Sequence, residues 1–463
     1  MEDVKFIVEP QRETAVIMDV DVAVAGGGPA GFVSAIAAAR NGAKTVLIER
    51  FNFLGGMAAT GLPFLTFHNL LHEQIIKGIP QELVDRLVEI GASPGHIFCP
   101  HHVSFTTFDP EMLKYVALQM AEEAGVKLLF HTFVACPIIK DNVVKGLIVE
   151  NKSGRQAILA KVVIDATGDA DLAVAAGAPY EKREVSILQP GTLMFRMGNV
   201  DVDKIREYIV KHPESLPTET EWEKQRIWEP KYFQENKKFI LVGLRNLVKE
   251  AREKGDYKSL QDFVILITLP REGEVAINMA KVIFDGSNAL SLSNAELEGR
   301  KSVMDVANFL KTYVPGFENS YLVDTAHHIG VRETRRIVGD YMLTKEDVMN
   351  DKKFDDGIAM CGYFMDVHAP GGRQQHFRGG AIKGFDIPYR CLVPRNVENL
   401  LVAGRTISST FEAQGAIRIM ATCMAVGQAA GTAAALAAKE GITPRQLNIQ
   451  RLRKTLKEQG AYF

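Results

Sequence analysis

The sequence predicts an α/β protein with a parallel sheet, and three observations lead to that prediction. An apolar run at residues 20–25 precedes a glycine-rich turn and a helix, and a second apolar run follows at residues 44–48. Another apolar run of strand length lies at residues 162–166, and a last one lies at residues 399–403, before a helix of small residues. Buried strands that alternate with helices are typical of a parallel sheet covered by helices.

The first turn has the residues of a dinucleotide site. Gly26 permits a tight turn, Gly28 lets the backbone approach a pyrophosphate, and Gly31 lets the following helix, residues 30–41, pack close to the sheet. The phosphates would then face the unpaired N–H groups of a helix N-terminus. Glu49 ends the second run with a carboxylate that can accept hydrogen bonds from a ribose diol and would repel a 2′-phosphate. The pattern therefore favours FAD or NAD over NADP.

The next elements extend the same sheet. Asp109-Pro110 is a typical helix start and predicts a helix to Ala124. After it we expect, in order, a strand at 126–130, a hairpin of 134–140 and 143–150, a short strand at 157–160, the buried strand at 162–166 and a helix opened by Thr167-Gly168-Asp169.

The middle of the chain differs in composition. Residues 201–260 are rich in Lys and Glu and contain both tryptophans, Trp222 and Trp228. We expect a helical insertion there, either a simple solvated one or a cap or oligomer contact. The elements that follow are a hairpin of 263–270 and 275–284 and a long helix at 294–313 capped by Asn294.

Both ends of the chain should build one domain. We expect residues 1–176 and 391–463 to form it and residues 177–390 to form an inserted domain.

The uncharged stretch 419–438 has the length of a membrane span. Its Ala, Gly, Thr and Gln content favours instead a helix packed on the sheet, where Gly427 and Gly431 allow close approach.

Composition narrows the class of protein. The 463 residues are 46% hydrophobic and 24% charged, with a formal net charge of −2, so nucleic acid is not an expected partner. The N-terminus lacks the features of a signal peptide, so we expect a cytoplasmic protein without a membrane anchor. No two of the cysteines form a C-x-x-C pair, which disfavours an iron–sulfur cluster; they are Cys99, Cys136, Cys361, Cys391 and Cys423.

Three further segments indicate FAD. A helix N-terminus contributes about 0.3–1 kcal/mol per nearby charge, whereas micromolar binding requires about 8 kcal/mol. One turn therefore cannot hold the cofactor. The other segments are 54–57, where Gly55-Gly56 can present N–H groups, 165–169 at the end of a buried strand, and 401–417, where a helix start could face the flavin.

With these segments the chain resembles the FAD-dependent oxidoreductases of the glutathione-reductase-type fold. More narrowly, it is similar to a large bacterial and archaeal family related to the flavoprotein subunit of heterodisulfide reductase, and more distantly to fumarate reductase and succinate dehydrogenase flavoproteins. The motifs that carry the resemblance are ERFNFLGGMAATG, ENKSGRQAILAKVVIDATGDADLA, HHIGVRETRRIVGDYMLT and DIPYRCLVPRNVENLLVAGR. The similarity is weakest in residues 201–260.

The resemblance implies a Rossmann-like FAD-binding domain with an inserted α+β substrate or cap domain. It also implies non-covalent FAD, because residues 51–54 lack the histidine that binds flavin covalently in the fumarate reductase branch. In such folds a backbone group at Val134 meets the adenine. The predicted cofactor contacts are Gly26, Gly28, Pro29, Ala30, Gly31, Glu49, Arg50, Gly55, Gly56, Met57, Val134, Ala166, Thr167, Gly168, Asp169, Gly404, Arg405, Gln414, Gly415, Ala416 and Ile417.

Candidate substrate residues lie in a cluster of His and Arg. His328, Arg332 and Arg335 could bind a carboxylate and supply a proton beside a flavin. Alternatively, the arginines pair with Glu333 and Asp340; this alternative covers Arg332, Arg335 and Arg336. A second candidate is the Gly-rich stretch 368–378, with His368 and Arg373. The spacing of His, Cys and carboxylates indicates no metal site.

The sequence thus favours an FAD-dependent oxidoreductase that transfers a hydride between a small organic molecule and FAD. Two alternatives stay open: a flavoprotein subunit that passes electrons to a partner protein, which the absent cysteine clusters disfavour, and an RNA-modifying flavoprotein, which the net charge disfavours. A homo-oligomer is compatible with the sequence.

Overall fold

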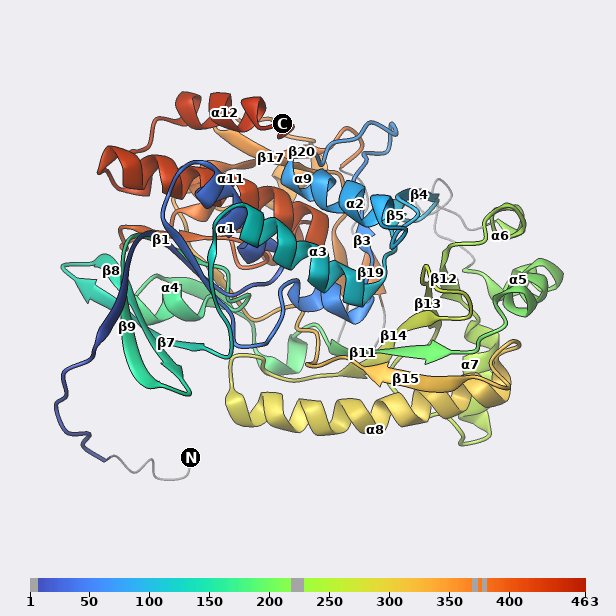
Figure 1. Ribbon diagram of the computed structural model, residues 1–463. Coiled ribbons are helices and arrows are strands. Elements are labelled where there is room, and N and C mark those ends of the chain that lie inside the picture. The colour runs from blue at the N-terminus through green and yellow to red at the C-terminus, as the bar shows by residue number, and fades with distance from the viewer. Residues whose placement is uncertain (1–6, 218–228, 369–373, 377–380) are drawn as a thin grey trace.

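The computed structural model describes residues 7–217, 229–368, 374–376 and 381–463 (Figure 1). The described residues form two hydrophobic cores. The first core draws on residues 20–178 and 337–456, and the second draws mainly on residues 193–329. The buried apolar residues of the first core include described residues between 337 and 390. The domain limits 1–176, 177–390 and 391–463 stay a prediction.

The first core surrounds a seven-stranded sheet in the order β6-β2-β1-β9-β8-β7, with β21 paired to β9. Pairing is parallel among β6, β2, β1, β9 and β21, and antiparallel among β9, β8 and β7. The strands are β1 Val16–Ala25, β2 Thr45–Ile48, β6 Lys127–Leu129, β7 Phe133–Lys140, β8 Val143–Asn151, β9 Gly154–Asp165 and β21 Leu400–Val402.

β9 corrects one expectation. The two strands predicted at 157–160 and 162–166 are a single strand, Gly154–Asp165. Its first half pairs with β8, from Gly154 to Leu159, whereas Val163 to Asp165 pair with β21. One long strand thus joins the hairpin to the parallel sheet, and its carboxyl end reaches the segment that begins at Ala166.

Small residues bring two helices together on this sheet. α1 Pro29–Arg40 packs against α11 Met420–Glu440. A Cβ at Gly427 would lie 2.3 Å from the carbonyl oxygen of Ala30, and one at Gly431 would lie 2.0 Å from that of Ser34. The predicted close approach is confirmed, but its partner is the backbone of α1.

The length and composition of α11 would allow it to cross a membrane. In the structure, 94% of its most apolar window is buried inside the protein. Such burial is what a core helix shows.

The second core lies under a five-stranded sheet in the order β12-β13-β14-β11-β15. Its strands are β11 Gly191–Gly198, β12 Ile240–Gly243, β13 Val264–Thr268, β14 Val275–Val282 and β15 Tyr321–Thr325. The long helix α8 Ala289–Tyr313 covers one face (Figure 1). Asn288, not Asn294, caps α8, because the oxygen of Asn288 accepts a hydrogen bond from Ser291 N–H.

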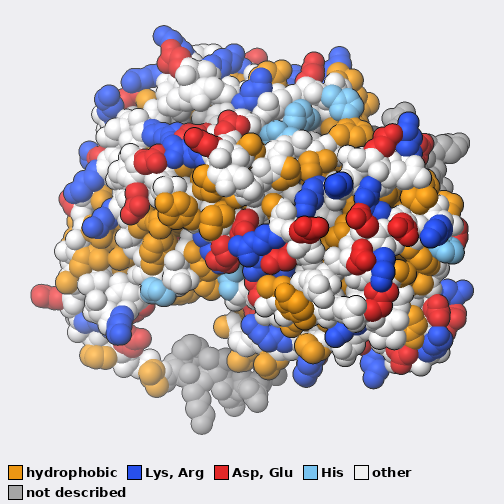
Figure 2. Space-filling model, turned by 45° about the vertical axis from the view of Figure 1, so that its right-hand side comes forward, with side chains coloured by type: hydrophobic (Ala, Val, Ile, Leu, Met, Phe, Trp, Pro, Cys, Tyr) orange, Lys and Arg blue, Asp and Glu red, His pale blue; other side chains and the backbone are white. Residues whose placement is uncertain are grey.

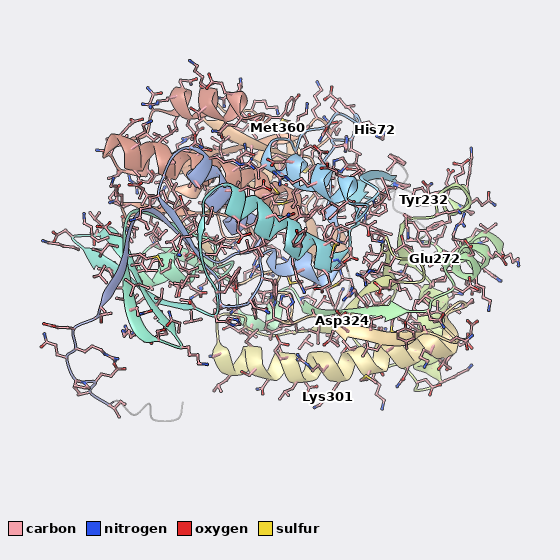
Figure 3. All side chains as sticks on the ribbon, viewed as in Figure 1. His72, Tyr232, Glu272, Lys301, Asp324 and Met360 are labelled. Carbon is pink, nitrogen blue, oxygen red and sulfur yellow. The ribbon has the colours of Figure 1, made fainter. Side chains whose placement is uncertain are left out.

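Lys301 lies on the outer side of α8, whereas Asp324 belongs to the sheet (Figure 3). Basic and acidic side chains are interspersed on the face that Figure 2 shows. Trp222 and Trp228 lie outside the described residues.

The remaining elements are short or flank these layers. The predicted helix after Asp109 is α3 Pro110–Glu123, and the one after Asp169 is α4 Asp171–Ala175. The others are η1 Gly56–Thr60, β3 Phe64–Leu65, α2 Ile79–Glu89, β4 His96–Cys99, β5 Val103–Thr106, β10 Tyr180–Lys182, η2 Val185–Ile187, α5 Val202–Lys211, η3 Pro213–Ser215, α6 Pro230–Glu235, α7 Arg245–Glu253, β16 Arg335–Ile337, α9 Lys345–Met349, β17 Gly357–Cys361, β18 Asp366–His368, β19 Gln374–His376, β20 Phe385–Pro388, η5 Tyr389–Leu392, α10 Phe411–Ile417, η6 Pro444–Gln446 and α12 Ile449–Glu458.

Candidate active site

A pocket runs from the carboxyl edge of the first sheet to the open face of the second sheet. Its lining combines the glycine turn, the end of β2, the segment after β9, the segment after β21 and strands of the inserted domain. The predicted cofactor residues that line it are Gly26, Gly28, Pro29, Ala30, Glu49, Arg50, Gly56, Met57, Val134, Ala166, Thr167, Gly168, Asp169, Gly404 and Arg405.

The glycine turn is shaped to receive a pyrophosphate. Gly28 is the N-cap of α1 and gives it no side-chain cap, so N–H groups of the first turn face the pocket. A Cβ at Gly28 would have no atom within 4 Å, whereas one at Gly31 would lie 1.8 Å from the carbonyl oxygen of Gly26. The protein thus needs Gly31 for packing and leaves the space at Gly28 open. That space fits the phosphates of a dinucleotide.

Glu49 fits the role of ribose acceptor. The side chain is buried, and its two oxygens accept hydrogen bonds from Gly27 N–H at 2.6 Å and Phe51 N–H at 2.9 Å. A carboxylate has about four acceptor positions. The contacts therefore fix Glu49 in the pocket lining and leave acceptor capacity for hydroxyl groups.

The segment after β9 is held by two carboxylates. Asp165 is fully buried and accepts hydrogen bonds from Thr167 N–H at 3.0 Å and Ala173 N–H at 2.9 Å. Burial raises the pKa of its carboxyl group. Asp169 accepts from Arg405 Nη2 at 2.8 Å and from Thr334 Oγ1 at 2.6 Å. These bonds tie together three distant segments around the pocket.

In the C-terminal segment, the residues that line the pocket lie further along the chain than the predicted cofactor contacts. Gln414, Gly415, Ala416 and Ile417 belong to the short helix α10 and do not line the pocket. Arg418, Ile419, Met420 and Cys423 line it instead. The physical reason is a break after α10: α11 starts afresh at Met420, and its N-cap, Ile419, provides no side-chain cap. N–H groups at this second helix start are therefore available to the pocket.

Two other predicted residues, Gly31 and Gly55, also lie outside the lining, and these two together with Gln414 and Gly415 have structural contacts. Gly31 permits the packing described above, and Gly55 donates its N–H to Gly27 O at 2.9 Å. A Cβ at Gly415 would lie 3.0 Å from Asp366 O, so this glycine allows α10 to approach β18. Gln414 donates from Nε2 to Arg332 O at 3.0 Å. All four support residues that do line the pocket, or the strands and helices around it.

The three predicted substrate residues separate in space. His328 lines the pocket and stacks on Phe51, with ring centroids 5.2 Å apart. Arg332 lines it from beside the inserted sheet. Arg335 does not line it, because its guanidinium bonds to Asp169 O at 2.8 Å and to the Asp171 carboxylate. The alternative of structural pairing therefore describes Arg335, although its partner is Asp171.

His327 and His328 are adjacent in the chain, and neither is charged at neutral pH. Burial, with the nearby cations Arg50 and Arg405, holds the pKa of His328 well below 6.5. Burial lowers the pKa of His327 to about 4. His328 is therefore a neutral side chain at neutral pH, and it lies near Arg50 and Arg405 of the predicted cofactor segments.

Arg332 is a partly buried cation whose hydrogen-bond partners are neutral. Its Nη1 donates to Pro190 O and, at 2.8 Å, to Thr192 Oγ1, and its Nη2 donates to Asn278 Oδ1 at 3.3 Å. Among the described residues it forms no ion pair. Burial, together with Arg418, lowers its pKa to about 9.

A buried polar chain next to Arg332 was missed in the sequence. Lys281 Nζ lies 3.4 Å from His368 Nδ1, and His368 Nε2 lies 3.2 Å from Asp366 Oδ2. Arg418 Nη2 donates to Asp366 Oδ2 at 3.0 Å. Burial lowers the pKa of Lys281 to about 7 and that of His368 to about 3. His368 was proposed for its Gly-rich stretch, most of which lies outside the described residues.

Part of the lining at this end of the pocket is apolar and comes from the inserted sheet. Ile240 and Val242 of β12 lie directly across from Ile267 and Ile265 of β13, and all four line the pocket. On each strand the two residues are two positions apart and therefore share a face of the sheet, a spacing that can be read from the sequence. Only strand pairing could show that the four share a wall.

The fold and the site together define a dinucleotide-binding flavoprotein: a Rossmann-like domain, a pyrophosphate cradle, a buried acid at the end of β2 and a second domain that closes the pocket. The chain matches the FAD dependent oxidoreductase family over residues 21–456 and belongs to it. FAD is therefore its cofactor, and the glycine cradle fits that assignment.

Curated relatives match only part of the chain. It is 32% identical to the thiamine thiazole synthase of Methanococcus maripaludis over 184 residues, covering 38% of this chain and 65% of the relative. It is 29% identical to the digeranylgeranylglycerophospholipid reductase of Methanocaldococcus jannaschii, covering 39% of this chain and 49% of that protein. The chain thus spans less than two thirds of the length of these two relatives.

Solved structures are more distant in sequence. A geranylgeranyl bacteriochlorophyll reductase-like protein from Thermoplasma acidophilum is 15% identical, with a TM-score of 0.46, over 95% of this chain and 84% of that one. A p-nitrophenol 4-monooxygenase from Pseudomonas putida is 12% identical, with a TM-score of 0.46, over 96% and 86%. The family match alone carries the assignment.

Proposed function

We propose that this family member transfers a hydride between a small organic substrate and FAD held without a covalent bond. The observation that carries the proposal is the continuity of the pocket. The same cavity contains Gly28 and Glu49 of the cofactor segments and Arg332, Asn278 and His368 beside the inserted sheet. A substrate at the second end would share the cavity with the cofactor at the first.

FAD supplies two-electron redox chemistry when it is bound. Around it, Gly28 and the start of α1 would receive the pyrophosphate, Glu49 the ribose, and the start of α11 the negative charge that reduction adds to a flavin. His328 would contact the cofactor as a neutral hydrogen-bonding group, because of its low pKa and its place near Arg50. We accordingly assign substrate binding to Arg332 and not to Arg335.

The buried chain offers a proton at the substrate end. With a pKa of about 7, Lys281 is a mixture of charged and neutral forms at neutral pH, whereas His368, with a pKa of about 3, is neutral. Lys281 would therefore be the group that gives or takes a proton, and the neutral His368, whose Nδ1 lies 3.4 Å from Lys281 Nζ, would orient it. A pKa near the working pH suits a group that must both give and take a proton.

The first experiment tests the cofactor and then the reaction. Purified protein should show the absorption of an oxidised flavin, and FAD should raise the melting temperature of the flavin-free form. Anaerobic screening of small organic compounds should then identify one that bleaches the flavin. A colourless protein that FAD does not stabilise would contradict the proposal.

We also propose a finer kinship with the flavoprotein subunit of heterodisulfide reductase, supported by the four sequence motifs, although the relatives compared above are thiazole synthases and a lipid reductase. A cytoplasmic location, self-association and an electron-transfer partner stay predictions of the sequence.

A further inference from the structure

One end of the pocket holds a cation, Arg332, to which no carboxylate of the described residues bonds directly. Arg418 is neutralised by Asp366, with Nη2 at 3.0 Å from Oδ2. Arg332 has only neutral acceptors: Pro190 O, Thr192 Oγ1 and Asn278 Oδ1. A partly buried charge without a bonded counter-ion is costly, so a bound anion would stabilise this arrangement.

The free edge of Arg332 has the shape that a carboxylate needs. Both Nη1 hydrogens have acceptors, whereas Nε donates to none of the described residues and Nη2 donates once. The same edge, Nε and Nη2, holds a carboxylate elsewhere in this chain: Arg390 bonds to Asp356 at 2.9 Å and 3.1 Å. Two parallel N–H donors match the two oxygens of a carboxylate.

We infer that the substrate is an amphipathic carboxylate, held by the Nε and Nη2 edge of Arg332, with its apolar body against the wall of Ile240, Val242, Ile265 and Ile267. This inference rests on the proposed function, because it names the substrate class of the same pocket. Asn278 and Thr192 are positioning residues, since they fix the guanidinium from the inserted sheet.

Alkanoates and their neutral amides test the inference in the holoenzyme. Octanoate should perturb the visible spectrum of the bound flavin saturably, and octanamide, which has the same shape without the charge, should bind at least about tenfold more weakly. Affinity should rise from butyrate to octanoate to dodecanoate, because each added methylene is removed from water.

Three variants locate the site. Arg332→Gln should abolish the preference for octanoate over octanamide while the protein retains FAD. Arg390→Gln, which changes an arginine of the same pairing type outside the pocket lining, should keep the preference. Ile265→Thr should weaken dodecanoate binding and leave butyrate binding unchanged, which separates the apolar wall from the anion site.

The outcomes separate the two proposals. A wild-type protein without FAD contradicts the proposed function itself. If FAD is bound and reducible but octanoate and octanamide bind equally, or no alkanoate perturbs the flavin, the carboxylate assignment is wrong. Loss of FAD from Arg332→Gln would also overturn it, because Arg332 would then belong to the cofactor site.

Discussion

Lys281 is a buried amine, and replacing it should make the protein more stable. Its side chain sits in the second core, near His368, and the surrounding charges are Arg332, Asp366, Asp262 and Arg245. Burial is the main reason that its pKa falls from 10.5 to about 7. At about 1.4 kcal/mol for each factor of ten, this fall corresponds to roughly 4–5 kcal/mol of lost stability at low pH.

The pH dependence has a defined sign. Below pH 7 the folded and unfolded chains both hold the Lys281 proton. The loss of stability caused by burying the charged amine is therefore constant in this range. Between pH 7 and 10.5 only the unfolded chain holds it, so stability rises with pH by up to about 1.4 kcal/mol per pH unit. Above pH 10.5 neither state holds the proton, and the cost is gone.

Lys281→Met should remove this cost. The substitution also leaves His368 Nδ1 without its partner, which costs about 1–3 kcal/mol of stability. The net gain in stability at pH 7 should therefore be a few kcal/mol. Urea unfolding of the FAD-loaded protein, followed by circular dichroism at pH 7 and pH 9, measures the effect. The control is Lys301→Met on the outer side of α8, where the side chain is 74% exposed. A variant that is less stable at pH 7, with the wild-type pH slope, would refute the reasoning.

The remaining predictions concern the glycines and Arg335. Gly28→Ala should fold normally yet bind FAD at least about tenfold more weakly, because its Cβ would fill the space of the pyrophosphate. Gly31→Ala should lose both the fold and FAD binding, because its Cβ would collide with the backbone. FAD titration and melting curves distinguish the two variants. Gly431→Ala should lower the free energy of unfolding by more than the roughly 1 kcal/mol expected for Gly42→Ala. The reason is that a Cβ at Gly431 would lie 2.0 Å from a backbone oxygen of α1, whereas a Cβ at Gly42 would have no atom within 4 Å. Equal losses in urea unfolding would contradict the α1–α11 contact. Arg335→Ala should leave reduction of the bound flavin unchanged in stopped-flow measurements and cost about 1 kcal/mol or less of stability; a large loss of rate would restore its catalytic role.

The local features of the cofactor site could be predicted from the sequence. Gly26, Gly28, Gly31 and Glu49 act through the backbone freedom or the charge of one residue at a fixed spacing, and the structure places them around one turn. The cap of α3 at Asp109 is equally local. The cap of α8 could not be predicted in the same way, because Asn288 and Asn294 are both residues that cap helices well. In the structure the helix begins after the earlier one, Asn288.

The family and its cofactor were therefore determined by the sequence, because glycine turns and a terminal acid are short-range signals. Only the tertiary structure decided the substrate end. The charges of this end come from separate segments and meet only after the two sheets pack; they belong to Arg332, Lys281, Asp366 and Arg418. The break after α10 places the start of α11, at Met420, in the pocket lining. Long-range packing brings such charges together, and no spacing along the chain records it.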